Sequence, residues 1–385
     1  MGKDLQGKEL GTGLSQRSNG TYQARYVDRW GKRKYLYGTD LSKLRERLIQ
    51  AQATNINRTS VKDNNLTLDE WYERWLKVYK EPVVRPNTLL NYTNVYTKNI
   101  RDVLGRRSLS DISKSDVQLL INTLEKQGYG YERQNEVRIL LNDLLARACE
   151  DDYLVKNPVR GVRILHDKPN ERLVLTEEQQ RTFFTFSVYS LYDNLFHVAI
   201  NTGLRVGELC ALTPNDIHLD EAYIDVNKTL VYQKYLTDSH KTFHIEPPKT
   251  KQSARRVPIN DECRKYLVKQ LSLKDVIRHK NPKIIDTEEI FVTQYNTRLN
   301  AQIVSDAIYD VVKHINMQRD FDNEFPMFTC HTFRHTFATN CLKNKVNPKI
   351  VQKILGHATL QMTMDLYTHV TDDMLNGVLN GVSMV

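Results

Sequence analysis

The sequence predicts a multidomain α+β protein, because its hydrophobic periodicity changes along the 385 residues. Short alternating runs near the N-terminus predict a small three-stranded sheet with one helix. A middle segment with apolar residues spaced by three and four predicts an all-α bundle. The C-terminal segment is again mostly helical but includes β-rich runs, so we expect a mainly α domain with a small antiparallel sheet.

Two polar stretches without periodicity separate these segments. We therefore expect domains at residues 1–54, 66–163 and 173–385, joined by linkers at 55–65 and 164–172. Each domain is of a size that can bury its own core.

The charge balance favours a polyanionic partner. The chain carries 55 Lys and Arg against 46 Asp and Glu, a formal net charge of +9. No apolar run is long enough to span a membrane, and because polar and charged residues follow Met1, we expect no signal peptide. The five cysteines form no CxxC pair, which favours reduced thiols and a cytoplasmic location.

The N-terminal segment has a large excess of basic residues. Strands are expected at Leu14–Ser18, Thr21–Asp28 and Lys34–Thr39, and Asp40 is expected to cap a helix that covers one sheet face. The other face stays free, and a sheet can enter the major groove of DNA. The candidate DNA contacts are Arg17, Gln23, Arg25, Arg29, Lys32 and Lys34. The alternative is a small solvated domain with ordinary surface charge.

The middle segment reads as a helical bundle. Thr67 begins a capping box with Glu70, and further helices fit Pro86–Ile100, Ser113–Lys126 and Tyr131–Asp151. Basic side chains on these helices, which include Arg133 and Arg138, are candidates to face a phosphate backbone. Charge on helices more often serves solubility, so this indication is weak by itself.

The C-terminal segment first shows a helix from Thr176 and another at Tyr192–Asn201. In the following Thr-Gly-Leu-Arg sequence, Gly203 ends a helix and Arg205 begins the next. A helix N-terminus binds anions through free N–H groups, and Glu208 is expected to hold neighbouring cations in place. The remaining expected elements are strands at Ala222–Val226, Lys228–Gln233 and Arg255–Ile259, then helices at Asp261–Leu271 and Ala301–Ile315.

Residues 328–367 gather further groups that can bind or attack a phosphate. His331 and Arg334 are three residues apart, so they share a helix face, and the guanidinium fork of Arg334 fits phosphate oxygens. Asn347 and Pro348 begin a helix that Gly356 ends, which places His357 at a rigid corner. Thr359 is expected to cap a third short helix that carries Tyr367.

These residues occur in the order Arg205, a lysine in a β-turn, His331-x-x-Arg334, Leu-Gly-His357 and Tyr367. With these residues in this order, the chain resembles the tyrosine recombinase family of the lambda-integrase type. The three-part layout is similar to integrases of conjugative transposons. The resemblance implies an arm-type DNA-binding domain at 1–54, a core-binding domain at 66–163 and a catalytic domain with a C-terminal tail helix at 173–385.

The resemblance also implies roles. Tyr367 is expected to attack the scissile phosphate and form a 3′-phosphotyrosyl link, which stores the bond energy for rejoining. Arg205 and Arg334 are expected to clamp the developing negative charge. Lys249 best matches the family's general acid, and Lys251 is the alternative.

The two histidines complete the expected catalytic set. His331 is expected to assist proton transfer at Tyr367, and His357 to hydrogen-bond the phosphate. Neither a carboxylate cluster, paired cysteines nor a phosphate-binding glycine loop stands in the sequence, so we expect no metal and no ATP as cofactor.

The expected partners are double-stranded DNA at core and arm sites and further copies of the chain, as a homotetramer on two duplexes that passes through a Holliday junction. An excisionase and a host DNA-bending protein are expected to assist integration and excision. In similar recombinases the tail docks on a neighbouring subunit, and docking on its own domain is the alternative. Two other functions stay open: a type IB topoisomerase-like enzyme and a non-catalytic DNA-binding regulator.

Overall fold

The structure, a computed structural model, describes residues 2–27, 33–56, 65–165, 173–248, 253–284, 287–320 and 323–364. The chain divides into two compact units, Met1–Pro169 and Asn170–Val385. Helices and antiparallel sheets occur in both, so the predicted α+β class is confirmed. Across these described ranges, no helix combines the length and the apolar character that crossing a bilayer demands.

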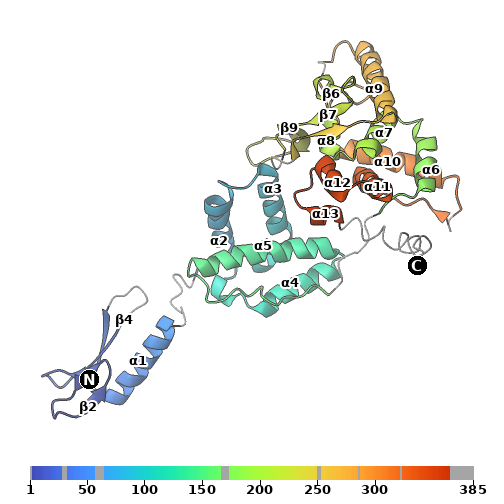
Figure 1. Cartoon of the computed structure of the whole chain (residues 1–385). Helices are drawn as coiled ribbons and strands as arrows, with labels where there is room; N and C mark the ends of the chain where they lie inside the picture. Colours follow the sequence, from blue (N-terminus) through green and yellow to red (C-terminus); the bar gives the residue numbers. More distant parts are fainter. Residues whose placement is uncertain are drawn as a thin grey trace, which may run out of the picture. The chain divides into compact units, whose positions relative to one another are not determined.

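The N-terminal part of the first unit contains an antiparallel sheet of order β3-β4-β5, followed by a helix (Figure 1). Asp40 caps this helix through two backbone N–H groups of its first turn. Leu44 and Leu48 of the helix pack against Leu14 and Ala24 of the sheet. The predicted elements are confirmed, and a short additional hairpin was not predicted. The bounds are β1 Gly2–Lys3, β2 Glu9–Gly11, β3 Leu14–Gln16, β4 Tyr22–Val27, β5 Arg33–Gly38 and α1 Leu41–Ile56.

The rest of the first unit is the predicted helical bundle. Thr67 and Ser113 cap their helices with reciprocal side-chain bonds. Trp71 is fully buried and donates from Nε1 to the carbonyl of Leu144 at 2.9 Å, which joins the first and last helices of the bundle. Figure 1 shows α4 and α5 side by side. The bounds are α2 Leu68–Trp75, η1 Leu76–Lys80, α3 Pro86–Val95, η2 Tyr96–Gly105, η3 Leu109–Asp111, α4 Lys114–Lys126 and α5 Tyr131–Glu150.

The second unit packs its helices around a core rich in phenylalanine. Phe183 lies within 5.5 Å of the rings of Phe196, Phe328 and Phe333, measured between ring centroids. The helix that carries Phe333 therefore shares one core with the helices that carry Phe183 and Phe196. The bounds are α6 Glu177–Ser187, α7 Asp193–Thr202, α8 Val206–Cys210, η4 Pro214–Asp216, α9 Asp261–Lys280, α10 Ala301–Asn316, α11 Cys330–Lys343, α12 Pro348–Leu355 and α13 Leu360–Met364.

Two small antiparallel sheets complete the second unit. One has the order β10-β7-β6, and β8 pairs with β9 in a separate hairpin. Arg255 lies opposite Val226 and Val257 opposite Ile224, so Arg255 shares the sheet face of the buried Val257. The predicted strands are confirmed, whereas β6 and β9 were missed. The bounds are β6 Ile217–His218, β7 Tyr223–Val226, β8 Thr229–Gln233, β9 Thr242–Glu246 and β10 Arg255–Pro258.

The predicted helix ends near the C-terminus are confirmed. Asn347 accepts the N–H of Lys349 at 2.8 Å, Pro348 is the first residue of α12, and Gly356 ends the helix with φ 64°. Helix α9 is nine residues longer than predicted, because its sequence is highly charged and its few buried positions form a weak pattern. All five cysteines are free thiols.

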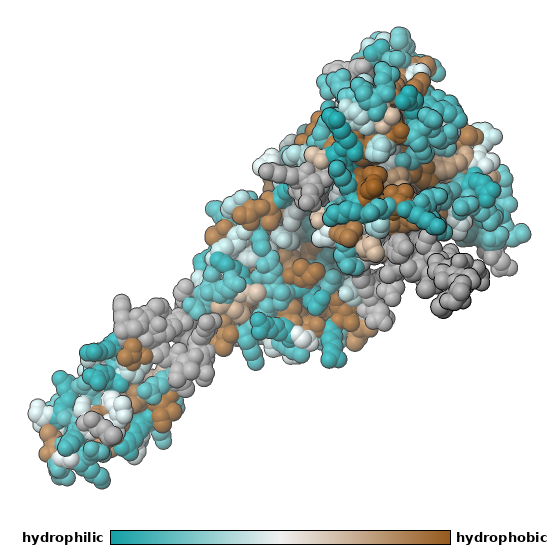
Figure 2. Space-filling model, viewed as in Figure 1, coloured by the Kyte–Doolittle hydropathy of each residue, from teal (hydrophilic) through white to brown (hydrophobic). Residues whose placement is uncertain are grey.

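Hydrophilic residues cover most of the face of the second unit seen in Figure 2, and hydrophobic residues are exposed near its centre. The exposed large apolar side chains of α12 and α13 are Ile350, Leu360 and Met362. Tyr367, the tail helix, Lys249 and Lys251 lie outside the described residues.

Candidate functional site

Arg205 stands at the start of a helix, as predicted. Gly203 closes α7 in the left-handed conformation, with φ 64°. Arg205 is then extended at the N-cap of α8, and its backbone N–H donates to the Oε2 atom of Glu208 at 2.9 Å. A Cβ at position 203 would lie 2.6 Å from Phe337 and 2.7 Å from Leu355, so only glycine allows α7 to end this close to α11 and α12.

Glu208 is a buried carboxylate shared by two arginines. Its Oε1 atom accepts from Nη1 of Arg205 at 2.8 Å. Nη1 and Nη2 of Arg255 donate to Oε1 and Oε2 at 3.0 and 2.9 Å, which is a two-pronged pair. Burial alone raises the pKa of Glu208. The hydrogen bond and charge of Arg255 and the charge of Arg205 lower it by more than burial raises it, so the pKa lies below its ordinary value. The expectation that Glu208 holds neighbouring cations is confirmed.

Arg334 is buried within the second unit. Its Nη1 donates to the carbonyl of Gly203 at 2.8 Å, and its Nη2 donates to the carbonyl of Leu355 at 2.6 Å. The residue is only 2% exposed. Burial, followed by the charge of Arg205, lowers the pKa of Arg334 to about 9. The guanidinium is therefore still charged at neutral pH.

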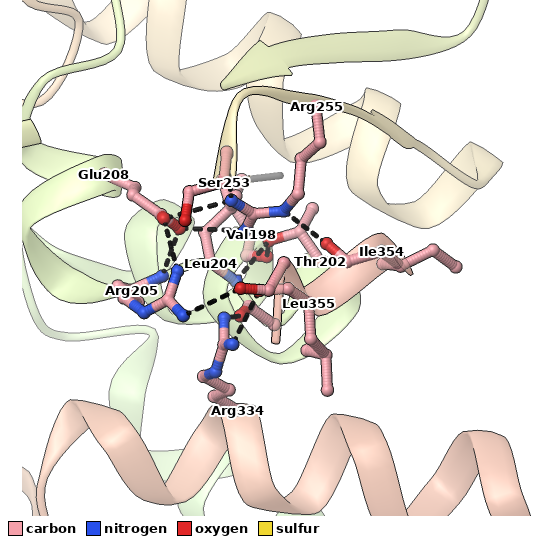
Figure 3. Close-up of polar contacts among 12 residues, drawn as sticks. Val198, Thr202, Leu204, Arg205, Glu208, Ser253, Arg255, Arg334, Ile354 and Leu355 are labelled. Carbon is pink, nitrogen blue, oxygen red and sulfur yellow. Dashed lines mark hydrogen bonds and ion pairs between the residues drawn. The ribbon is translucent and has the colours of Figure 1, made fainter. Parts of the chain in front are cut away.

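Three arginines from three elements meet at the C-terminal end of α12 (Figure 3). Arg255 donates to the carbonyl of Ile354, Arg334 to that of Leu355, and Arg205 to that of Gly356 at 3.3 Å. A helix C-terminus has unpaired carbonyls and a partial negative charge, so it stabilises nearby cations. With one carboxylate against three guanidiniums, the cluster keeps a net positive charge that suits a phosphate.

His357 follows this helix end at the expected corner. Its Nδ1 lies 2.9 Å from Oγ1 of Thr363, and its backbone N–H donates to the carbonyl of Gln352 at 3.1 Å. The residue is buried at 8% exposure. His331, by contrast, is exposed on α11, and its ring meets that of His335 edge-on with centroids 4.5 Å apart.

A cavity of about 370 Å³ lies beside Arg205. Glu208, Lys228 and Gly356 line it, and so do Pro248 and Ser253, the two described residues that flank the loop 249–252. Lys228 is held by Asp216, whose Oδ2 lies 2.5 Å from its Nζ. The cavity can therefore receive an anion next to an accessible guanidinium.

The structure brings Arg205, Arg334 and His357 together around the end of α12. Sequence reasoning missed Arg255, although its place two residues before the buried Val257 of a strand predicts an inward side chain. Lys228 was also missed as a cavity residue, and no local pattern distinguishes it from other surface lysines.

The N-terminal candidates divide between two sheet faces. Arg25 pairs with Tyr35 across the strands, and Lys34 pairs with Tyr26. Since side chains alternate, Arg25 lies on the face without α1, and Lys34 lies on the other. Arg17 stacks over Tyr37 at 5.4 Å, on the Arg25 face. Tyr35 and Tyr37 are 44% and 46% exposed there and were missed as candidates. Arg29 and Lys32 lie outside the described residues.

The bundle candidates both have local partners on α5. Arg133 donates to Glu136 at 2.8 Å, and Arg138 donates to Asn135 at 2.8 Å. Both arginines are half-buried. Both arginines belong to the first unit, whereas the cluster around α12 belongs to the second.

Three family models match the chain. The model of the phage integrase family matches residues 173–374, that of the phage integrase N-terminal SAM-like domain matches 67–125, and that of the DNA binding domain of tn916 integrase matches 1–55. The first match alone spans more than half of the chain.

Known proteins match over most of the length. The transposase from transposon Tn916 of Enterococcus faecalis is 29% identical over 395 residues, covering 96% of this chain and 94% of the relative. The integrase of Escherichia phage HK022 is 24% identical, covering 77% of this chain and 74% of the relative.

Solved structures agree with these similarities. The Tn1549 transposon integrase, in complex with transposon right end DNA, has a TM-score of 0.71 at 25% identity, covering 83% of this chain and 100% of that one. A lambda integrase tetramer bound to a Holliday junction has the same fold, with a TM-score of 0.57 at 22% identity, covering 93% of this chain and 95% of that one.

Proposed function

The chain belongs to the phage integrase family of tyrosine recombinases, and from this premise we propose how its residues carry out strand cleavage and joining. It is a DNA strand transferase, the integrase of a mobile element, which cuts and rejoins DNA at specific sites. The residue assignment rests on the positive cluster at the end of α12. Arg205 belongs to this cluster and also lines the cavity.

Cleavage begins with attack of the Tyr367 oxygen on the scissile phosphorus. The bond from phosphorus to the 5′ oxygen breaks, leaving a 3′-phosphotyrosyl link and a free 5′-hydroxyl. Arg205 binds a non-bridging oxygen from the cavity, because its side chain is 36% exposed and keeps N–H groups beyond those bonded to Glu208 and Gly356. Such a preorganised donor is typically worth about 10²–10³ in rate.

Arg334 acts from the interior of the domain, on the buried side of the arginine cluster. Its guanidinium is bonded to two backbone carbonyls, so it contributes a fixed positive charge and holds the ends of α7 and α12 together. Its remaining N–H groups reach the phosphate only if the bound DNA draws them outward, since the residue is almost fully buried.

The loop 249–252 supplies the general acid that protonates the leaving 5′ oxygen. Lys249 is the first choice and Lys251 the alternative. This assignment is supported by the flanking residues Pro248 and Ser253, which both line the cavity. His331 assists proton transfer at Tyr367, and His357 hydrogen-bonds the phosphate through Nε2 while Thr363 holds Nδ1. The reaction uses no metal and no ATP.

DNA binding is divided between the segments. We assign arm sites to the N-terminal sheet face that carries Arg17 and Arg25, and core sites to the bundle and the catalytic domain, with Arg133 and Arg138 as bundle contacts. The working assembly is a homotetramer on two duplexes that passes through a Holliday junction, with the tail of one subunit docked on the next. An excisionase and a host DNA-bending protein assist it, and the reaction takes place in the bacterial cytoplasm.

The first test uses a nicked duplex that carries the element end, so that the cleaved strand cannot be rejoined. The intact chain should accumulate a covalent protein–DNA adduct, and Tyr367→Phe should form none while still binding the DNA. Equal adduct from both chains would refute the assignment of Tyr367. Absence of adduct from the intact chain, with binding retained, would favour the non-catalytic regulator.

A second assay separates recombinase from topoisomerase. Two duplexes with element ends should exchange strands, and the products should depend on the protein reaching a multimeric state. Relaxation of supercoils by a monomer without strand exchange would instead support the type IB topoisomerase-like enzyme.

A further inference from the structure

Arg255 connects three parts of the catalytic domain. It stands on β10, three residues after the loop 249–252, and its side chain is only 3% exposed. It donates to Glu208 through both Nη atoms, to the carbonyl of Ile354 through Nε, and to the carbonyl of Ser253 at 3.0 Å. One buried guanidinium thus joins Glu208 of α8, the end of α12 and Ser253 (Figure 3).

Each of these contacts leads to an assigned catalytic group. Glu208 also binds Nη1 of Arg205, so the carboxylate that Arg255 holds in turn fixes the phosphate-binding arginine. The Ile354 carbonyl lies three residues before His357. Gly356 packs directly on Arg255, because a Cβ there would lie 3.1 Å from its Cδ and 3.2 Å from its Nη1.

We propose that Arg255 is a positioning residue for strand cleavage, which acts through Glu208 on Arg205 and through the end of α12 on His357. This inference rests on the proposed function. Arg255 does not touch the phosphate, since its donors are directed to the carboxylate and to the two carbonyls. Its contribution is to fix the orientation of Arg205 and the position of the end of α12 relative to α8.

Lysine cannot replace this side chain fully. A planar fork satisfies a carboxylate with two parallel bonds while Nε serves a third acceptor, whereas one ammonium offers a compact charge without that geometry. Arg255→Lys therefore keeps the charge balance around Glu208 but relaxes its orientation. Arg255→Gln removes the charge as well.

The strand offers a matched control. Arg256 is the next residue, faces the other side of the sheet, and also pairs with a carboxylate, Asp225, at 3.4 Å. Its side chain is 70% exposed and lies over the ring of Tyr223 at 4.6 Å. Arg256→Gln removes an equal charge from the same strand without touching the cluster.

The experiment measures single-turnover adduct formation by the full chain on the nicked element-end duplex, at saturating DNA and well below the melting temperature. DNA affinity and melting temperature are measured for each variant alongside. Arg255→Gln should cleave about 100-fold slower with unchanged DNA affinity, because a small misplacement of reacting groups slows a reaction by about that factor. Arg255→Lys should recover part of the rate, and Arg256→Gln should match the wild type.

Two results would overturn the proposal. The first is a wild-type cleavage rate in Arg255→Gln, counted per folded and DNA-bound molecule. The second applies if Arg255→Gln does not fold: a wild-type cleavage rate per bound complex in Arg255→Lys would then contradict the positioning role. Failure of the proposed function is distinguishable, since the wild-type chain itself would then form no adduct.

Discussion

The Nη2 atom of Arg334 donates to the carbonyl oxygen of Leu355 at 2.6 Å, in the interior of the catalytic domain. The second Nη atom donates to Gly203, which precedes Arg205 by two residues. Arg334 therefore joins the segment that carries Arg205 to the segment that carries His357. The same side chain supplies charge to the site and stability to the fold.

Replacing Arg334 with lysine should damage both properties. One ammonium cannot reach the carbonyls of Gly203 and Leu355 as the fork does, and a buried unpaired carbonyl costs about 1–3 kcal/mol. We expect Arg334→Lys to lower the melting temperature of the full chain and to abolish measurable adduct formation. The control is Arg256→Lys, at a side chain that is 70% exposed. Equal melting temperatures for Arg334→Lys and the wild type would contradict the buried, two-acceptor position.

Gly356 should not accept a side chain. Its φ of 64° disfavours residues with a Cβ by about 1–2 kcal/mol, and the added atom would also press on Arg255. Gly128→Ala is a matched control, because its φ is +83° but nothing lies within 4 Å of the added Cβ. Gly356→Ala should lower the melting temperature more than Gly128→Ala and should slow cleavage. Equal effects on stability would show that contact with Arg255 adds nothing.

Local chemistry made much of this site predictable. The end of α7 at Gly203, the start of α8 at Arg205 and the corner at Gly356 depend on capping residues within one turn, so the sequence indicates them directly. The partners of the arginines are not local. Arg255 reaches Glu208 across 47 positions, and Arg334 reaches Gly203 across 131, and only the fold reveals such pairs.

The N-terminal sheet shows a second limit of sequence reasoning. Its strands and turn follow from composition, but the face on which a side chain lies depends on register, and a shift by one residue reverses it. Arg25 and Lys34 were therefore grouped as contacts although they lie on opposite faces. The exposed Tyr35 and Tyr37 beside Arg25 become visible only once that register is known.

This division of faces can be tested by salt dependence. Arg25→Ala should weaken binding of the full chain to an arm-site duplex and reduce the slope of log affinity against log salt by about 0.9, the value for one lost phosphate contact. Lys34→Ala serves as the control, since it removes one charge from the other face of the same sheet. A larger loss for Lys34→Ala would show that DNA binds on the side of α1.

His197 should make the catalytic domain sensitive to acid. It is stacked between Phe184 and Tyr266, at centroid distances of 4.1 and 3.6 Å. Burial, and then the charges of Lys269 and Lys265, lower its pKa from 6.5 to about 4. As the pH falls from 6.5 to about 4, His197 is protonated in the unfolded chain but stays neutral in the folded chain. The free energy of unfolding therefore declines through that window by up to about 3 kcal/mol.

A phenylalanine at position 197 would keep the stack without the titrating ring. Thermal unfolding of the full chain, measured from pH 7 to pH 4, should show a shallower decline for His197→Phe than for the wild type. Asp193 lies 3.7 Å from the imidazole, and burial raises the pKa of its own carboxyl group. Identical declines for the two chains would mean that His197 takes up its proton in the folded state.

The most direct test of the whole account is the chemical identity of the covalent bond to DNA. The adduct from the nicked duplex can be digested with protease and nuclease, and the attachment point read by mass spectrometry. The account predicts one modified peptide, with the 3′-phosphate on Tyr367, among the 20 tyrosines of the chain. A phosphate on any other tyrosine, or a link to the 5′ end of the DNA, would contradict it.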